Sequence, residues 1–300
     1  MHKMWERPSR PRDARTRLLS VSRLRSVRRL RRLPRFSREL RRRLFVCDVS
    51  VSVVSPHPRL VEAAVDLTIL FYTCNRIDER FASAVRAELL KSINGRFPII
   101  CVSHQLMDFG DVRVVVGDVR QSISQVYRNI LIGCHAAETT YCAVAEDDAL
   151  YVPEHFDFRP PLDTFCYNEN RWILSRRLAQ DGKRREGFYF FNPRTQMAQG
   201  IFARELMIAA LTERFAAHPN PPLDTTVAKK SGWGEPGRYE KNLSLMPRKL
   251  ARFQWTSRPN VIINHSESLM GRRQARAEHP TCTDLPPWGG SDALWAKIHG

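Results

Sequence analysis

The chain has 300 residues, 43% of them hydrophobic, which suits one large domain with or without a terminal extension. It contains no run of the ~20 continuous apolar residues that a membrane-spanning helix requires, and its N-terminus lacks the apolar core of a signal peptide. Length and composition therefore predict a soluble, cytoplasmic protein.

The net charge of +17 is concentrated near the N-terminus. Residues 1–43 hold 17 of the 48 basic residues and three acidic residues, whereas the remainder holds 31 basic and 28 acidic residues. We interpret residues 1–45 as an arginine-rich arm, disordered or helical, and 46–65 as a linker. The arm could contact a polyanion, resemble a transit peptide or lie outside the working protein, and like-charged runs usually stay solvated. The nearly neutral body does not indicate a nucleic-acid surface.

The cysteine pattern excludes two kinds of site. There are seven cysteines, an odd number, and none form a C-x-x-C pair. This argues against a disulfide framework and a structural zinc site, and it predicts buried thiols in a reducing compartment.

From residue 66 the pattern alternates between buried strands and helices. The predicted strands are Leu67 to Tyr72, Phe97 to Val102, Val112 to Val116 and Tyr141 to Ala145. Helices are predicted over Asp78 to Ile93, stopped by Asn94-Gly95, and over Ser122 to Ala137. Such alternation predicts an α/β fold with a mostly parallel, doubly wound sheet flanked by helices.

The second half of the chain is less regular. Short strands are predicted at Thr164 to Tyr167, Trp172 to Leu174 and Gly187 to Phe191, and a helix at Gly200 to Phe215. The remainder is rich in proline and glycine and is interpreted as loops. We place the domain at 66–290 and a C-terminal tail at 291–300.

Polar side chains follow three of the predicted strands. Ligands of doubly wound sheets bind at the carboxyl ends of the strands, which here are Thr73 to Arg76, Ser103-His104 and Glu146 to Asp148. Three crowded carboxylates repel one another, and a divalent cation removes that cost. Oxygen ligands suit Mn²⁺ or Mg²⁺, which a diphosphate would help to coordinate. The alternatives are a solvated loop that caps a helix and the acids of a nucleotidyltransferase, although no Walker-type phosphate loop is present.

These segments resemble family-2-type GT-A glycosyltransferases, and more closely a set of phage and bacterial glycosyltransferase-like proteins. The resemblance covers about residues 66 to 290 and is strongest in the first half. It is carried by Phe71–Arg76, Leu90–Ile93, Pro98–Ser103, Met107–Gly110, Glu146–Phe156 and Tyr167–Trp172, and more weakly by Gly232–Gly237 and Asn264–Gly271. Departures at Cys74, in the basic segment Ser175–Glu186 and around Gln196 to Gly200 put the donor sugar and acceptor in doubt.

The resemblance implies roles for individual residues. Asp148 is the first metal ligand, Glu146 contacts metal or ribose, and Asp147 could exchange with either. His265 is a candidate third metal ligand, although a lone histidine is often a hydrogen-bonded loop residue. The nucleotide-sugar donor would be bound by Tyr72, Thr73, Asn75, Arg76, Ser103, Arg128, Glu146 and Asp147.

The acceptor side rests on four residues. Glu235, in a glycine-rich loop, is the candidate general base, and Asp224 is its rival. Trp172 and Trp233 offer flat faces on which an acceptor could stack, although either ring could instead pack in the core.

The predicted function is metal-dependent transfer of a sugar from a nucleotide-sugar donor to an acceptor hydroxyl. One alternative acts on modified DNA bases, as phage enzymes do, and is motivated by the basic arm. Another is a non-catalytic nucleic-acid-binding protein with a decayed transferase fold. The sequence leaves the donor, the acceptor, the stereochemistry and the oligomeric state open.

Overall fold

A computed structural model describes residues 52–54, 65–178, 184–192, 195–221, 223–224, 233–237, 252–269 and 273–299. The predicted arm at 1–45 lies outside the described residues. Within the predicted linker, strand β1 (Ser52–Val54) is described. No helix in the described part of the chain combines the length and apolar composition needed to cross a membrane.

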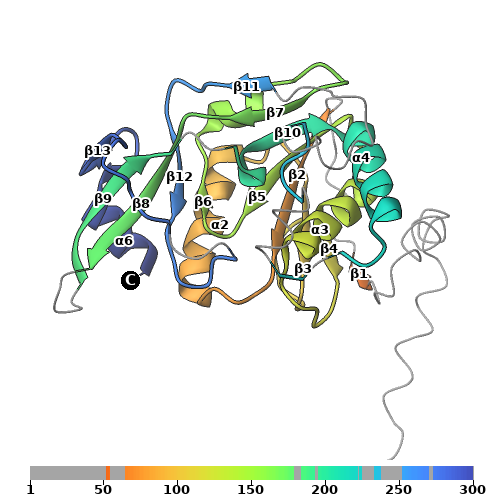
Figure 1. Cartoon of the computed structure of the whole chain (residues 1–300), viewed down its shortest axis with the longest axis horizontal. Helices are drawn as coiled ribbons and strands as arrows, with labels where there is room; N and C mark the ends of the chain where they lie inside the picture. The colour runs from red at the N-terminus through yellow and green to blue at the C-terminus, as the bar shows by residue number, and fades with distance from the viewer. Residues whose placement is uncertain are drawn as a thin grey trace, which may run out of the picture. The chain divides into compact units, whose positions relative to one another are not determined.

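The main sheet has eight strands in the order β1-β4-β3-β2-β5-β10-β7-β11 (Figure 1). Strands β4, β3, β2 and β5 are parallel, and β10 runs antiparallel to both β5 and β7. The strands after β1 are β2 (Leu67–Thr73), β3 (Ile99–Ser103), β4 (Val112–Val115), β5 (Tyr141–Glu146), β7 (Phe165–Asn168), β10 (Gly200–Ala203) and β11 (Arg252–Gln254).

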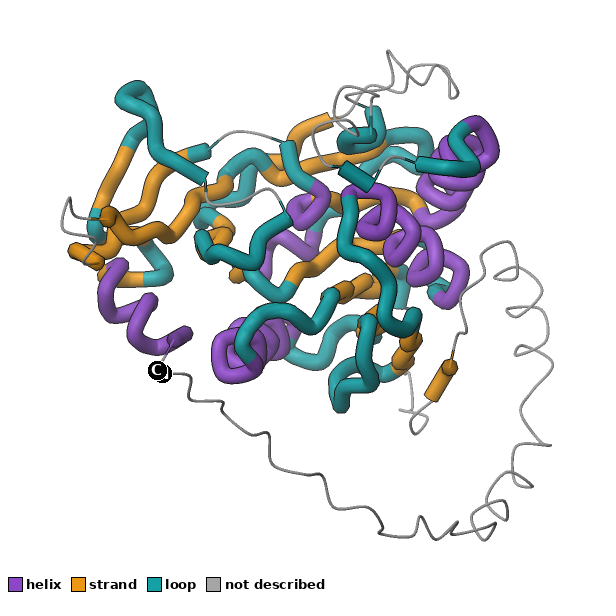
Figure 2. Tube along the Cα trace, turned by 60° about the horizontal axis from the view of Figure 1, so that its bottom comes forward, coloured by secondary structure: helices purple, strands orange, loops and turns teal. Residues whose placement is uncertain are grey.

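Helices cover both faces of this sheet (Figure 2). The helices are α2 (Glu79–Ile93), α3 (Ile123–Ala136) and α4 (Arg204–Ala217). Successive side chains of β2 point to opposite faces, so Leu70 packs with the cluster of α3 and α4, whereas Phe71 packs with Leu89 of α2. The predicted α/β class, with a mostly parallel sheet flanked by helices, is confirmed.

Local signals set the ends of helix α2. The Asp78 carboxylate accepts hydrogen bonds from the backbone N–H groups of Arg80 (3.0 Å) and Phe81 (3.3 Å). At the other end, Asn94 adopts a left-handed conformation with φ of 45°, at the predicted stop.

A second sheet, in the order β13-β9-β8-β12-β6, meets the first at the acidic segment. Its strands are β6 (Ala149–Leu150), β8 (Arg171–Leu178), β9 (Arg184–Phe191), β12 (Asn260–Ile263) and β13 (Thr281–Cys282). Because β6 follows β5 after only Asp147 and Asp148, the three acids lie where the chain passes from one sheet to the other.

The C-terminal residues pack onto the second sheet and α2. A small hairpin of β14 (Asp284–Leu285) and β15 (Gly289–Gly290) leads into α6 (Ser291–His299). Leu294, Trp295 and Ile298 of α6 are buried in one cluster with Phe81 of α2. The segment that we separated as a tail therefore contains a packed helix.

One predicted element needs correction. We expected a helix from Gly200, but residues Gly200–Ala203 form β10, and the helix starts at Arg204. The four residues are fully enclosed between β5 and β7, so tertiary pairing overrides the helical pattern that they continue. Two short 3-10 helices complete the description, η2 (Pro153–Asp157) and η3 (Met197–Gln199).

Candidate functional site

The acidic segment is held between two sheets. Glu146 ends β5, and Asp147 and Asp148 form the turn into β6. The backbone N–H of Ile263, the last residue of β12, donates to the Asp148 carbonyl oxygen at 2.8 Å. The backbone carrying the acids is thereby fixed from the β12 side, and the segment after β12 is brought to the same place.

Each acid faces a different partner. Tyr72 Oη donates to Glu146 Oε1, and Thr73 Oγ1 donates to Asp147 Oδ2. Since Tyr72 and Thr73 are consecutive on β2, they place these two carboxylates on opposite sides of the sheet end. Asp148 Oδ2 lies 3.2 Å from His265 Nε2.

Asp148 has an unused acceptor atom. Its side chain is 13% exposed, and Oδ1 is buried without a hydrogen-bond partner. His265 Nδ1 is also buried without a partner, and the imidazole packs 5.8 Å from the Phe81 ring. Buried carboxylate oxygens are rarely left unpaired, so this position favours a ligand at Asp148 Oδ1.

Crowding and burial shift the pKa values of the site's titratable groups. Burial, reinforced by the charges of Asp148 and Asp147, raises the pKa of Glu146 to about 8. Burial and Asp148 raise the pKa of Asp147 to about 6. For His265, burial opposes protonation, but Asp148 outweighs it and the pKa is raised. All three shifts indicate that the site favours added positive charge.

The metal prediction fits part of this arrangement. Among the described residues, no group of three or more histidine, cysteine or acidic side chains is assembled as a ligand set. Asp148 Oδ1 and His265 are suitable in chemistry and position, because one is an unpaired carboxylate oxygen and the other lies beside it. Glu146 and Asp147 are instead engaged by hydroxyl groups.

A cavity of about 380 Å³ opens beside the acids. Of the predicted donor-binding residues, Thr73, Asn75 and Asp147 line it. Asn75 has a left-handed backbone with φ of 56°, and its side-chain Oδ1 accepts from the Gln105 N–H at 2.9 Å. This bond joins the segments that follow β2 and β3, as expected for a ligand site at strand ends.

The other predicted donor-binding residues lie in different settings. Ser103 is buried, and its hydroxyl donates to the Gln105 carbonyl at 2.7 Å, so it shapes the cavity rim. Burial and the Arg76 charge lower the pKa of His104, the residue that follows β3. Arg128 stacks over Phe215 of α4 at 5.1 Å, on the helical layer.

Hydrogen bonds hold the backbone on both sides of Glu235. The carbonyl of Gly234 accepts from Arg214 at 3.0 Å, and that of Pro236 accepts from Tyr167 Oη at 2.8 Å. Tyr167 of β7 pairs with Gly200 of β10. Gly200 directly follows η3, and η3 packs against β5. Asp224, the rival base, is exposed, and its position gives no preference over Glu235.

The two tryptophans differ. Trp233 is 1% exposed, and its ring packs against Tyr127, Phe215 and His218. The prediction that it stacks on an acceptor is therefore corrected, because the ring has no face open to a ligand. Trp172 is partly exposed and lies 5.7 Å from Phe191, so a stacking role for it stays a prediction.

Sequence reasoning missed a basic group at the site. Arg273 donates to Gln196 Oε1 at 2.8 Å, and its charge acts to lower the pKa of Glu146. The Asn264 side chain makes two hydrogen bonds to the backbone of Arg273. It donates to the Arg273 carbonyl at 2.7 Å and accepts from the Arg273 N–H at 2.8 Å. The only available signal was an arginine soon after the Asn264-His265 pair. Buried Arg171 also donates to Gln196 Oε1.

Comparisons with known proteins give little further information. No family model matches the chain, and no curated protein matches it. Among solved structures, the chain is similar to a glycosyltransferase involved in the glycosylation of the major capsid of PBCV-1, at 11% identity and a TM-score of 0.38, over 65% of this chain and 91% of that chain. A match at this TM-score carries no functional inference for this chain.

Proposed function

We propose that the chain is a metal-dependent glycosyltransferase of the GT-A type, which transfers a sugar from a nucleotide-sugar donor to an acceptor hydroxyl. The observation that carries this proposal is the Asp148–His265 pair, with a buried, unpaired carboxylate oxygen at the carboxyl end of the parallel strands. The adjoining cavity of about 380 Å³ is large enough for part of a nucleotide.

The donor nucleotide would occupy that cavity. Thr73 and Asn75 provide hydroxyl and amide groups at the end of β2, and the Gln105 backbone is fixed across from them by Asn75. Tyr72 and Ser103 support the wall through bonds to Glu146 and to the Gln105 carbonyl.

Asp148 and His265 would hold Mn²⁺ or Mg²⁺, with Glu146 or Asp147 as further oxygen donors. A bound cation would neutralise the negative charge that develops on the leaving nucleoside diphosphate. Arg273 adds a second positive group beside the proposed metal site. Its planar guanidinium group can bind two phosphate oxygens at once. The two hydrogen bonds from Asn264 would fix the position of Arg273 relative to His265, which follows Asn264 in the chain.

Glu235 is the proposed general base, accepting the proton of the acceptor hydroxyl as that oxygen attacks the sugar. Its neighbours Gly234 and Pro236 are anchored to α4 and β7, so the carboxylate is carried by a segment fixed on both sides. Asp224 remains the alternative base.

The experiment is donor binding by calorimetry, using UDP-, GDP- and CMP-linked sugars with and without Mn²⁺. We expect one donor class to bind, and its binding to require both Mn²⁺ and Asp148. The test variant is Asp148→Asn, and the matched control is Asp157→Asn, whose side chain is 56% exposed and pairs with Arg96. Binding of no donor, or equal binding without the metal, would contradict the proposal.

The alternative functions make different demands. Those that involve DNA rest on residues 1–45, which lie outside the described part of the chain. Nucleotidyl transfer would use the same acids, and it predicts pyrophosphate release from a nucleoside triphosphate rather than binding of a nucleotide-sugar.

A further inference from the structure

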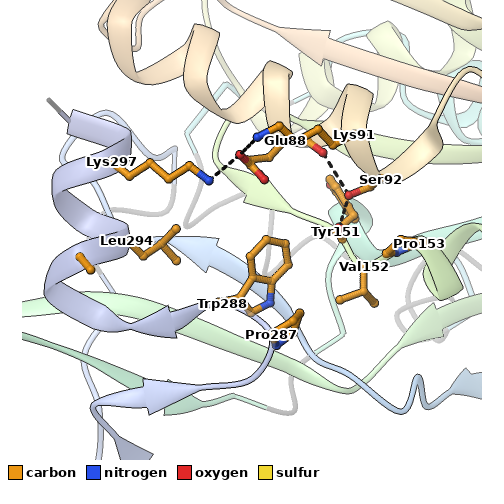
Figure 3. Close-up of a pocket in the computed structure, with 11 residues that line it drawn as sticks. Glu88, Lys91, Ser92, Tyr151, Val152, Pro153, Pro287, Trp288, Leu294 and Lys297 are labelled. Atoms are coloured by element: carbon orange, nitrogen blue, oxygen red, sulfur yellow. Dashed lines mark hydrogen bonds and ion pairs between the residues drawn. The ribbon is translucent and has the colours of Figure 1, made fainter.

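A second cavity, of about 390 Å³, lies between α2 and α6. It is lined by Glu88, Lys91 and Ser92 of α2, by Tyr151–Pro153, and by Pro287, Trp288 and α6 residues that include Leu294 and Lys297 (Figure 3). Its volume falls within the range of small-molecule sites. The proposed donor cavity adjoins the first half of α2, at Glu79, Ala82 and Arg86, so the two cavities are separate.

One wall of this cavity carries a fixed carboxylate between two ammonium groups. Lys91 Nζ and Lys297 Nζ lie 2.8 and 2.7 Å from the same carboxylate oxygen, Glu88 Oε1. The Glu88 side chain is 13% exposed, whereas those of the lysines are 66% and 54% exposed. Each ammonium has three N–H donors, so donor and acceptor groups stand side by side.

The opposite wall is apolar and presents an aromatic ring. Figure 3 shows the Trp288 ring standing between α6 and the Tyr151–Pro153 segment. Trp288 Nε1 donates to the Pro259 carbonyl at 2.7 Å, which fixes the orientation of the ring. Val152, Pro287 and Leu294 extend the apolar surface around it.

We propose that this cavity binds a neutral saccharide unit. A sugar ring combines hydroxyl groups, which can donate to Glu88 and accept from Lys91 and Lys297, with an apolar C–H face that fits the Trp288 ring. An anion would compete with Glu88 for the two ammonium groups that Glu88 already pairs, and a purely apolar ligand would leave three charged groups desolvated. The inference goes beyond the proposed transfer reaction, since it concerns a separate site with its own residues.

The test is saturation-transfer NMR on the full chain without metal or nucleotide. The probes are methyl glycosides of glucose, galactose, mannose and N-acetylglucosamine, with acetate and inorganic phosphate as anionic probes, each at up to about 10 mM to detect millimolar affinity. We expect saturable binding of at least one glycoside and of neither anion. Glu88→Gln and Trp288→Leu should each weaken it about tenfold or more.

Two controls separate binding from folding and from transfer. Leu90→Ala changes an α2 side chain outside the cavity and should leave binding unchanged. If Trp288→Leu lowers the melting temperature, Glu88→Gln and Lys297→Met, which preserve side-chain size, decide the result. Asp148→Asn should abolish donor binding yet keep glycoside binding, so failure of one proposal is distinguishable from failure of the other.

Three results would overturn the proposal. They are the absence of saturable glycoside binding, binding of the anions alone, and glycoside binding that Glu88→Gln and Lys297→Met leave unchanged in folded protein.

Discussion

Two of the buried polar clusters among the described residues differ in charge and in hydrogen bonding. The acidic cluster holds Glu146, Asp147 and Asp148 with like charges and an unpaired oxygen. The amide cluster consists of Asn168, Asn170, Thr256 and Asn260, all of which are buried. Comparing them separates polar groups that stabilise the fold from polar groups that reduce its stability and suit a ligand.

The amide cluster is neutral, and its bonds are made within the protein. Asn168 Nδ2 donates to Thr256 Oγ1 at 2.9 Å, and Asn170 Nδ2 donates to the Thr256 carbonyl at 2.8 Å. Asn260 Oδ1 accepts from the Val152 N–H at 2.9 Å, and its Nδ2 donates to Gln199. These bonds join β7 to Thr256, in the segment that follows β11, and they join β12 to Val152 and to η3. The cluster is therefore expected to stabilise the packing of these segments.

The largest expected effect is on the acidic cluster. Asp148→Asn should reduce sugar transfer about a thousandfold, because a bound cation supplies several kcal/mol to the transition state. The same change removes a like charge from beside Glu146, so the melting temperature should stay equal or rise. Turnover with the donor found by calorimetry, and thermal unfolding of the same variant, check both parts. A variant that melts early and loses activity in proportion would contradict the comparison.

The next largest effect is a pH dependence of the free energy of unfolding, which comes from His155 beside the amide cluster. His155 is fully buried, and burial lowers its pKa to about 3 from 6.5. Between these values the unfolded chain binds the extra proton, so the free energy of unfolding falls as the pH falls. The loss is about 1.4 kcal/mol per pH unit, or roughly 3 kcal/mol over two units below pH 6.5.

His155→Phe should remove this contribution, because phenylalanine does not titrate and keeps an aromatic ring against Tyr151. The measurement is the difference in urea unfolding free energy between the protein and the variant at several pH values. Equal slopes for the two proteins would show that His155 is not held neutral.

Asn260→Ala should lower the free energy of unfolding by about 2 kcal/mol, because it leaves the Val152 N–H and the Gln199 amide oxygen without this partner. Urea unfolding at neutral pH measures it. Asn220→Ala, at an exposed bend, is the matched control and should change stability little. Equal effects of the two changes would mean that the amide cluster does not stabilise the fold.

The smallest expected effect is a difference in donor binding between variants of Arg273 and Arg128. Arg273→Gln should weaken donor binding about tenfold, the value of one charged hydrogen bond to a phosphate. Arg128→Gln should leave it unchanged, since Arg128 stacks on Phe215 of α4. Calorimetry with both variants checks this. The reverse result would favour the role that the sequence suggested for Arg128.

The sequence predicted the parallel strands and the place of the acids because those signals are local. Leu67 to Tyr72 is a mostly apolar run, which is typical of a strand buried on both faces. Asn94 ends helix α2 because it adopts a left-handed backbone conformation. The three acids follow a buried strand directly, so the position of their carboxylates at the sheet edge was readable.

The remaining features depend on contacts between distant residues. Trp233 is buried by Tyr127 and Phe215, and the charge of Arg273 acts on Glu146 because β12 pairs with β6 and β8. β11 and β12 are too short to give a recognisable alternation of apolar and polar residues, and Pro259 directly precedes β12, so the sequence alone predicts loop at both. No periodicity in the sequence identifies such pairings.

The most direct measurement is anomalous diffraction from crystals of the full chain soaked with Mn²⁺ and the nucleoside diphosphate of the preferred donor. The account predicts an anomalous peak bonded to Asp148 Oδ1 and His265 Nε2, with the diphosphate next to Arg273. A peak at other residues, or a bound diphosphate with no Mn²⁺ at Asp148, would contradict it.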